Sequence, residues 1–349
     1  MPTPSEPLNS DRPHRSVFGN YKPAEADPAK IEKVASSLTP SLSPKERGKR
    51  GQRVDESGAP RDSAAEDDLH PLPVGEGRGE GEGTVRSPES LQSSIDFAVA
   101  RSFLYRFIAK AFEDPEREGW ESLCQSEQQS SFWSAVRALA EGAPPNLESV
   151  AGRLLRHLKS DGYSAFESDY ITCFGHTVRG DCPMNEIEYG DIKADPLFQP
   201  HRLADLGAFY AAFGLEIAPE AAERQDHISI ELEFMSILAA KEAYALEHRL
   251  EDEQAAVCGE AQKTFLREHL GRWTPAFTRR LARMAGGTAL GALADFTREF
   301  ITEDCARFKV TPGSEDLLLR PTDEASESLC ASCGITNLPP GATRSPVEG

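Results

Sequence analysis

Apolar residues recur at helical spacing along most of the chain between residues 90 and 308. In the first such segment five of them follow one another every four residues, so they share one face of a helix: Ile95, Val99, Phe103, Phe107 and Ala111. Ser87 followed by Pro88 is typical of a helix start. Pro115 ends the segment, because the residue before a proline avoids helical geometry.

The same periodicity predicts further helices, separated by short polar or proline-containing breaks. They are expected at about 117–126, 130–141, 146–160, 163–174, 201–213, 226–248, 252–271, 273–284 and 287–304. Alternating β-branched residues are rare, so no strand ladder is predicted. We therefore expect an all-α protein with a single helical bundle domain spanning residues 91–312, which is within the usual size range of a domain.

The two ends of the chain have a different composition. The first 94 residues contain 12 Pro and 9 Gly but only two aromatic residues, Phe18 and Tyr21. So few apolar side chains cannot offset the entropy lost on ordering, and residues 1–90 are predicted to be a disordered, low-complexity segment. Residues 313–349 are again polar, and we expect a flexible tail carrying the pair Cys330-x-x-Cys333.

The net charge of the chain excludes some classes of binding partner. The formal net charge is −19, which argues against binding to nucleic acid phosphates, since that requires a basic face. No apolar run approaches the length of a membrane span, so no stable membrane insertion is expected. No secretory signal is visible at the N-terminus, and seven cysteines, an odd number, suggest a reducing cytoplasm.

One predicted helix begins within Glu223-Arg224-Gln225-Asp226-His227 and continues with apolar residues on two faces. Such a helix is central in a bundle. Asp226 is positioned to accept hydrogen bonds from the first turn as the N-cap. The alternative to a functional role is that Asp226 is only a cap and that His227 is only a surface residue of the first turn.

A long connection between residues 175 and 200 is the second candidate region. Long loops in compact domains are often functional. Within it, Cys182-Pro183-Met184-Asn185-Glu186-Ile187-Glu188-Tyr189 places the acid Glu186 and the phenol Tyr189 one turn apart if a short helix begins there.

These segments, in this order, resemble the TorD/DmsD/NarJ family of cytoplasmic chaperones for molybdenum enzymes. The resemblance covers about residues 95–308. It is carried by the Phe-rich first helix, Cys-Pro-x-x-Glu-x-x-Tyr at 182–189, Leu-Gly-Ala-Phe-Tyr at 206–210, Glu-x-x-Asp-His at 223–227, Glu-Leu-Glu-Phe-Met at 231–235 and His-Leu-Gly-Arg-Trp at 269–273. Gln225 stands where the family often has proline, and Asn185 where it often has an aromatic residue.

The resemblance implies an all-helical fold and a non-enzymatic task. Family members bind the twin-arginine signal peptide of a catalytic subunit and retain the apo subunit until its molybdopterin cofactor is inserted. The partner expected for this chain is therefore an apo subunit of a molybdopterin oxidoreductase, before its export through the Tat pathway. No cofactor of its own is expected. The sequence leaves open a monomer or a domain-swapped dimer.

By position, the resemblance places five residues at the border of a peptide-binding site: Glu186, Tyr189, Glu223, Asp226 and His227. The apolar part of a signal peptide needs a groove, and Phe209 and Tyr210 complete the predicted site as aromatic residues that could line it. The assignment is chemically reasonable, because carboxylates match guanidinium groups in forked geometry and aromatic residues can line a groove for an apolar segment. The alternative for Phe209 and Tyr210 is an ordinary place in the core.

Three other functions remain open from the residues alone. Cys173, His176 and Cys182 lie within ten residues, and Cys330 and Cys333 form a second pair, so either set could serve a metal or redox role. An enzyme is disfavoured, because no nucleophile elbow, phosphate loop or His-Glu-x-x-His motif occurs. A permanent assembly subunit suits the acidity and helicity as well as a chaperone does.

Overall fold

The computed structural model describes residue 18 and residues 88–140, 146–175, 180–190, 198–218, 221, 223–248 and 252–320. These residues form α-helices joined by loops, and contain isolated β-bridges but no strands. The α-helices are α2 (Pro88–Ala111), α3 (Arg117–Cys124), α4 (Ser126–Ala140), α5 (Asn146–His157), α6 (Tyr163–Phe174), α7 (Phe198–Ala212), α8 (Ile228–Glu247), α9 (Asp252–Glu268), α10 (Leu270–Met284) and α11 (Ala289–Arg307). Short 3₁₀ turns cover Ser160–Gly162 and Glu186–Glu188. The predicted all-α class is confirmed.

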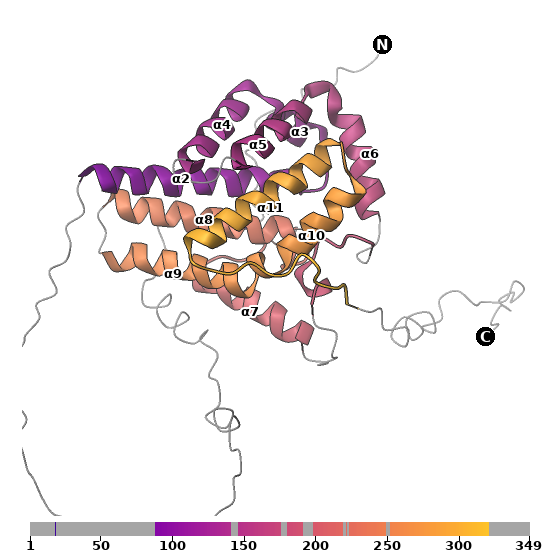
Figure 1. The fold of residues 1–349 in the computed structure, drawn as a ribbon. Coiled ribbons are helices and arrows are strands. Elements are labelled where there is room, and N and C mark those ends of the chain that lie inside the picture. Colours follow the sequence, from indigo (N-terminus) through magenta and orange to yellow (C-terminus); the bar gives the residue numbers. More distant parts are fainter. Residues whose placement is uncertain are drawn as a thin grey trace, which may run out of the picture.

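Helices α2 and α8 pack along each other at the centre of the bundle (Figure 1). Helices α3, α4 and α5 lie on one side of this pair, and α9 and α7 lie on the other (Figure 1). Both apolar stripes predicted for α8 are buried as far as Ala239, because α8 contacts α2 and α9 at once. The prediction that this helix is central in the bundle is therefore confirmed.

Several helix boundaries differ from the prediction by a few residues, and the difference at the end of α9 has a tertiary cause. The periodicity suggested a helix that continues to residue 271, but α9 ends at Glu268 and α10 begins at Leu270. The single residue between them, His269, has non-helical backbone angles and a buried side chain. The break turns this side chain towards Glu186, a tertiary contact that no local spacing encodes.

A buried ion pair joins the first and last helices. Arg101 of α2 donates from Nε and Nη2 to the Asp304 carboxylate of α11 at 2.6 and 2.8 Å. The Tyr105 hydroxyl donates to the same carboxylate at 2.6 Å. The buried carboxylate therefore accepts hydrogen bonds from three donors, which offset the cost of its burial.

Residues 313–320, which we call the C-terminal strap, pack on the domain. Gly313 N donates to Gly271 O at 2.9 Å, Gly190 N to Leu318 O at 3.1 Å, and Arg320 N to Glu188 O at 2.9 Å. The tail predicted from residue 313 therefore begins with eight residues that contact α10 and the 180–190 loop. Cys330 and Cys333 lie outside the described residues.

Phe18 is the one described residue among the first 87, so the prediction of disorder for residues 1–90 falls almost entirely outside the described part. Its side chain is 1% exposed. It forms an antiparallel bridge with Ile217, in the connection that follows α7. A residue of the N-terminal segment thus lies within the helical domain.

No helix in the described ranges combines the length and the apolar character needed to cross a bilayer.

Candidate functional site at the joint between the 180–190 loop and helix α8

The 180–190 loop is joined to the start of α8 through backbone hydrogen bonds. Asn185 and His227 form an antiparallel bridge. Glu186 N donates to Asp226 O, and Ile228 N donates to Met184 O, both at 2.9 Å. We call this pairing of residues 184–187 with 226–228 the joint. It brings together the two sequence segments singled out above.

Asp226 does not cap α8, so the prediction of an N-cap role is wrong. Its carboxylate is fully buried and accepts from Asn185 Nδ2 and Ile187 N at 3.2 Å each. Arg224 also donates to both carboxylate oxygens, from Nε to Oδ1 and from Nη2 to Oδ2. The preference of aspartate for the N-cap position does not decide its place here, because the loop and Arg224 offer this carboxylate more hydrogen-bond donors than the first turn of a helix would.

His227 is the N-cap of α8 instead. Its Nδ1 accepts from Ser229 N at 3.3 Å and lies 2.7 Å from Ser229 Oγ. Burial, together with the nearby Arg224 charge, lowers the pKa of His227 to about 3. The imidazole is therefore neutral at physiological pH. Its Nε2 lies 3.7 Å from Glu223 Oε2, facing the accessible side of the joint.

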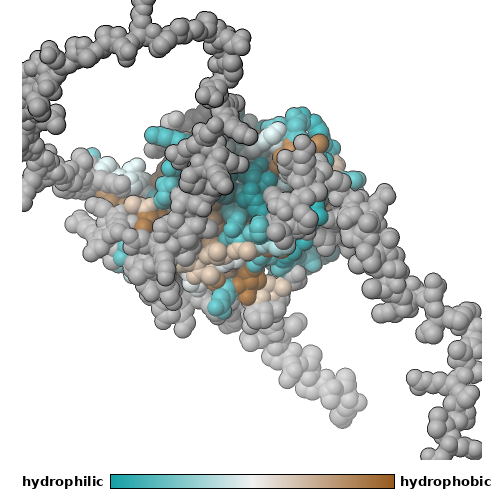
Figure 2. Space-filling model, turned by 90° about the horizontal axis from the view of Figure 1, so that it is seen from below, coloured by the Kyte–Doolittle hydropathy of each residue, from teal (hydrophilic) through white to brown (hydrophobic). Residues whose placement is uncertain are grey.

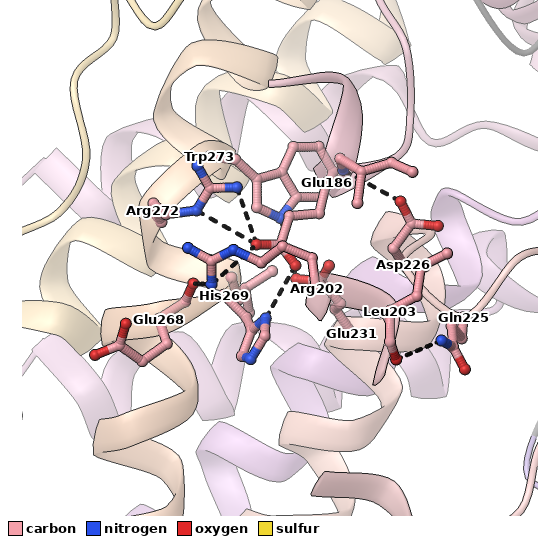
Figure 3. Close-up of polar contacts among 12 residues, drawn as sticks. Glu186, Arg202, Leu203, Gln225, Asp226, Glu231, Glu268, His269, Arg272 and Trp273 are labelled. Carbon is pink, nitrogen blue, oxygen red and sulfur yellow. Dashed lines mark hydrogen bonds and ion pairs between the residues drawn. The ribbon is translucent and has the colours of Figure 1, made fainter. Parts of the chain in front are cut away.

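Glu186 is the centre of a buried ionic cluster (Figure 3). Arg272 donates to its Oε1 from Nη2 at 3.0 Å, and His269 Nδ1 lies 3.0 Å from its Oε2. Arg202 lies 3.9 Å from Oε1 and donates to Glu268 O at 2.7 Å. Helix α7, helix α10 and the break between α9 and α10 thus all attach to the loop through the one carboxylate of Glu186.

A second glutamate, Glu231 of α8, lies in the same region, but its pKa is shifted in the opposite direction from that of Glu186. Burial alone would raise the pKa of Glu186, but His269, Arg272 and Arg202 more than offset it and the pKa is lowered. Burial and then the Glu186 charge raise the pKa of Glu231 well above its usual value. The environment of Glu231 therefore favours its neutral carboxylic acid, and Trp273 Nε1 donates to its Oε2 at 3.1 Å. The pKa values of the two neighbouring carboxyl groups are thus shifted in opposite directions.

Tyr189 closes the other end of the loop. It is fully buried, and its hydroxyl donates to Pro183 O at 2.8 Å. Its ring lies 5.2 Å from that of Trp273. The hydroxyl therefore fixes the curvature of the loop from inside, while the ring anchors the loop on α10.

Phe209 and Tyr210 of α7 are buried as well, at 3% and 2% exposure. Phe209 packs edge-on against His269 at 5.4 Å, and Tyr210 donates through its hydroxyl to Gln225 O at 2.8 Å. Gln225 in turn donates to Leu203 O. Each aromatic residue is thus one contact away from the joint.

Glu223 is the accessible residue among the seven. Its side chain is 41% exposed, whereas the other six residues are buried. Burial and then the Asp114 charge raise the pKa of Glu223. Viewed from the side of α7 and α9, the molecule shows hydrophilic surface at its centre with apolar positions beside it (Figure 2).

The structure therefore gathers all seven predicted residues around one joint, and their role as peptide ligands stays a prediction. Sequence reasoning missed the basic partners: Arg202, Arg224, His269 and Arg272. The segment at 269–273 was part of the family pattern, and it carried a signal for His269 and Arg272. No local signal pointed to Arg202, since its partner Glu186 lies across an irregular connection.

A metal site at Cys173 and Cys182 finds no support in the described residues, among which no group of three potential ligands comes together. Both thiols are buried, and burial raises the pKa of Cys182 to about 12. His176, Cys330 and Cys333 lie outside the described residues.

Comparisons with known proteins agree on one class of relative. Residues 140–279 match the family described as nitrate reductase delta subunit. The perchlorate reductase assembly chaperone protein of Dechloromonas aromatica is 25% identical over 214 residues, which are 61% of this chain and 92% of that protein. The selenate reductase assembly chaperone protein of Thauera selenatis is 33% identical over 146 residues, 40% of this chain and 72% of that protein. A chaperone protein TorD of Vibrio cholerae is 28% identical over 119 residues, 34% and 52% of the two chains.

Proposed function

Because the chain belongs to the TorD/DmsD/NarJ family of chaperones for molybdoenzyme maturation, we propose that it binds the twin-arginine signal peptide of an apo catalytic subunit. That subunit is a molybdopterin oxidoreductase, held in the cytoplasm until its cofactor is inserted and then released for Tat export. The relatives are named as chaperones or assembly proteins, so the chain is a chaperone and not an enzyme.

The joint is the observation that carries the proposal. The family segments at 182–189, 206–210, 223–227 and 269–273 meet there, although they come from separate parts of the chain. Arg224 on Asp226 is an internal example of the forked guanidinium–carboxylate contact that a leader arginine requires. The site is thus chemically suited to a basic peptide.

The seven residues would have different roles in peptide binding, depending on how deeply each side chain is buried. Glu223 contacts a leader guanidinium directly, because it alone among the seven is largely accessible. The conformation of the 180–190 loop is maintained by four buried residues: Glu186, Tyr189, Asp226 and His227. Phe209 and Tyr210 are buried beneath the groove that would receive the apolar part of the signal peptide.

The test uses the full chain and a synthetic peptide with the twin-arginine leader of a molybdopterin enzyme encoded by the same host. Glu223→Gln should weaken binding by about fivefold, because it removes a partly exposed ion pair. The matched control is Glu148→Gln, which removes the same charge from the exposed face of α5. Equal affinities for the wild type and both variants would show that Glu223 is no ligand, and absence of any leader binding would refute the proposal.

A second measurement distinguishes a chaperone from a permanent assembly subunit. A chaperone should copurify with the reductase subunit before export and not with the exported, cofactor-loaded enzyme. Retention in the mature complex would favour the permanent subunit.

A further inference from the structure

Phe18 occupies an aromatic pocket formed by α7, α8 and the connection after α7. Its ring lies edge-on to Tyr210 at a centroid distance of 5.2 Å and at 6.5 Å from Phe234. Tyr210 and Phe234 themselves pack at 4.9 Å. Since Phe18 is 1% exposed, the pocket encloses the whole side chain.

The backbone contact shows how a peptide enters this pocket. Phe18 and Ile217 form an antiparallel bridge, which is the first step of strand addition by an extended segment. Tyr210, the floor of the pocket, donates its hydroxyl to Gln225 O, next to Asp226 at the joint. The pocket is therefore continuous with the candidate site.

The sequence before Phe18 has the order of charges expected of a client leader. Arg12 and Arg15 precede the aromatic residue. On the pocket side, Glu216 is exposed and adjacent to Ile217, and the half-exposed Glu223 lies six residues further along. Opposite charges thus flank a buried aromatic anchor on the two segments.

In sequence, the 69 residues from 19 to 87 separate Phe18 from the start of α2. Burial of one ring is offset by the entropy of closing a loop of this length. Such a tether gives a local concentration on the order of millimolar, which a tighter-binding peptide in solution can overcome.

We propose that the N-terminal segment around Phe18 is an internal ligand of the Tyr210–Phe234 pocket, and that an incoming signal peptide displaces it by inserting an apolar side chain of its own. This inference rests on the proposed function. The pocket would then be filled in the resting chaperone, and only peptides that outcompete the tethered segment would bind.

The first experiment tests the internal contact without any client. A fluorescent peptide with the sequence of residues 11–24 is titrated into full-length wild type, Phe18→Ala and the control Leu38→Ala, and its anisotropy is measured. We expect Phe18→Ala to bind it at least about tenfold more tightly than the wild type, because the tethered competitor is gone. Leu38→Ala should behave as the wild type does, and a peptide with alanine in place of its phenylalanine should bind to none of them.

The inference fails if the peptide binds the wild type and Phe18→Ala equally, or binds neither while Phe18→Ala keeps the helicity and melting temperature of the wild type. It also fails if Phe18→Ala loses its cooperative unfolding transition, since Phe18 would then be a permanent part of the core.

The second experiment adds the twin-arginine leader peptide to Phe18→Ala that is already loaded with the fluorescent peptide. Release of the fluorescent peptide supports displacement. Leader binding without release overturns the inference and leaves the proposed function intact. Absence of leader binding, with the fluorescent peptide still bound, overturns the proposed function and displacement while the internal contact stands.

Discussion

Glu186 and Glu231 are both fully buried near the joint, yet their surroundings shift their pKa values in opposite directions. Glu186 is an anion held by Arg272, His269 and Arg202. For Glu231, burial and then the Glu186 charge raise the pKa, which favours the neutral acid. Their difference comes from the partners that the fold supplies and not from the residue type.

The same substitution at these two positions should therefore give different results. Glu186→Gln leaves the guanidinium groups of Arg272 and Arg202 without their buried counter-ion and should cost about 3–5 kcal/mol of unfolding free energy. Glu231→Gln puts a neutral amide where the environment favours the neutral acid and should cost about 1 kcal/mol or less. Urea unfolding at pH 7 measures both, and equal losses would contradict the assignment of charges.

His227 should make the stability of the protein depend on pH. Its pKa is about 3 in the folded chain and about 6.5 in the unfolded one, so the unfolded state takes up the proton first. Its contribution is complete above pH 6.5 and is lost as the pH falls towards 3. His227→Asn keeps a capping side chain but does not titrate.

Between pH 7.5 and pH 5 the wild type should accordingly lose about 2 kcal/mol more unfolding free energy than His227→Asn loses. Urea titrations of both proteins at the two pH values give the comparison. Parallel losses in the two proteins would mean that His227 takes up its proton without unfolding.

At the scale of elements, the α9–α10 break depends on Gly271. A Cβ atom at this position would clash with Leu266 O and would lie 2.8 Å from Cys305 Sγ. Gly259, within α9, is a matched control, since a Cβ atom added there would meet nothing within 4 Å. The two glycines thus differ in the space around them, and the same substitution tests that difference.

Gly271→Ala should lower the unfolding free energy by about 1–3 kcal/mol, because the added methyl group meets backbone and a buried sulfur atom. Gly259→Ala should raise it by about 0.5–1 kcal/mol, since alanine is the better helix former. Thermal or urea unfolding of the two variants measures the difference, and two changes of the same sign would contradict the packing described at the break.

The helices were predictable from the sequence because apolar spacing reports burial, as it does for both stripes of α8 as far as Ala239. The stripe predicted for α2 is buried only towards its end, at Phe107 and Ala111, whereas Val99 is 52% exposed. The joint was predictable only in part. The family pattern identified its segments, but Asp226 was assigned the wrong partner, because cap preferences are local whereas Arg224 and Ile187 N compete through tertiary structure. The contact of Phe18 lay beyond any local pattern.

At the scale of the whole molecule, most of the net negative charge lies after residue 94. Residues 1–94 carry 13 basic and 16 acidic residues, so the remainder carries 25 basic and 41 acidic residues, a balance of −16. A field of this sign attracts basic peptides over distances of about a Debye length. Association with a leader peptide should therefore be steered by charge.

The association rate constant of the twin-arginine leader should fall by about tenfold between low and 0.5 M salt. Stopped-flow fluorescence measures it, and a leader with glutamine in place of both arginines serves as the control with little salt dependence. Equal salt dependence for the two peptides would show that the acidity of the domain serves only solubility.

The C-terminal strap has a practical consequence. Arg320 is hydrogen-bonded to Glu188 of the loop, and Phe18 lies against Tyr210, so both described ends of the chain lead away from the neighbourhood of the joint. An affinity tag or a bead attached close to Phe18 or to Arg320 would therefore crowd the surface under study. Coupling through the exposed face of α5, on the opposite side of α2 (Figure 1), would leave that surface open during immobilisation.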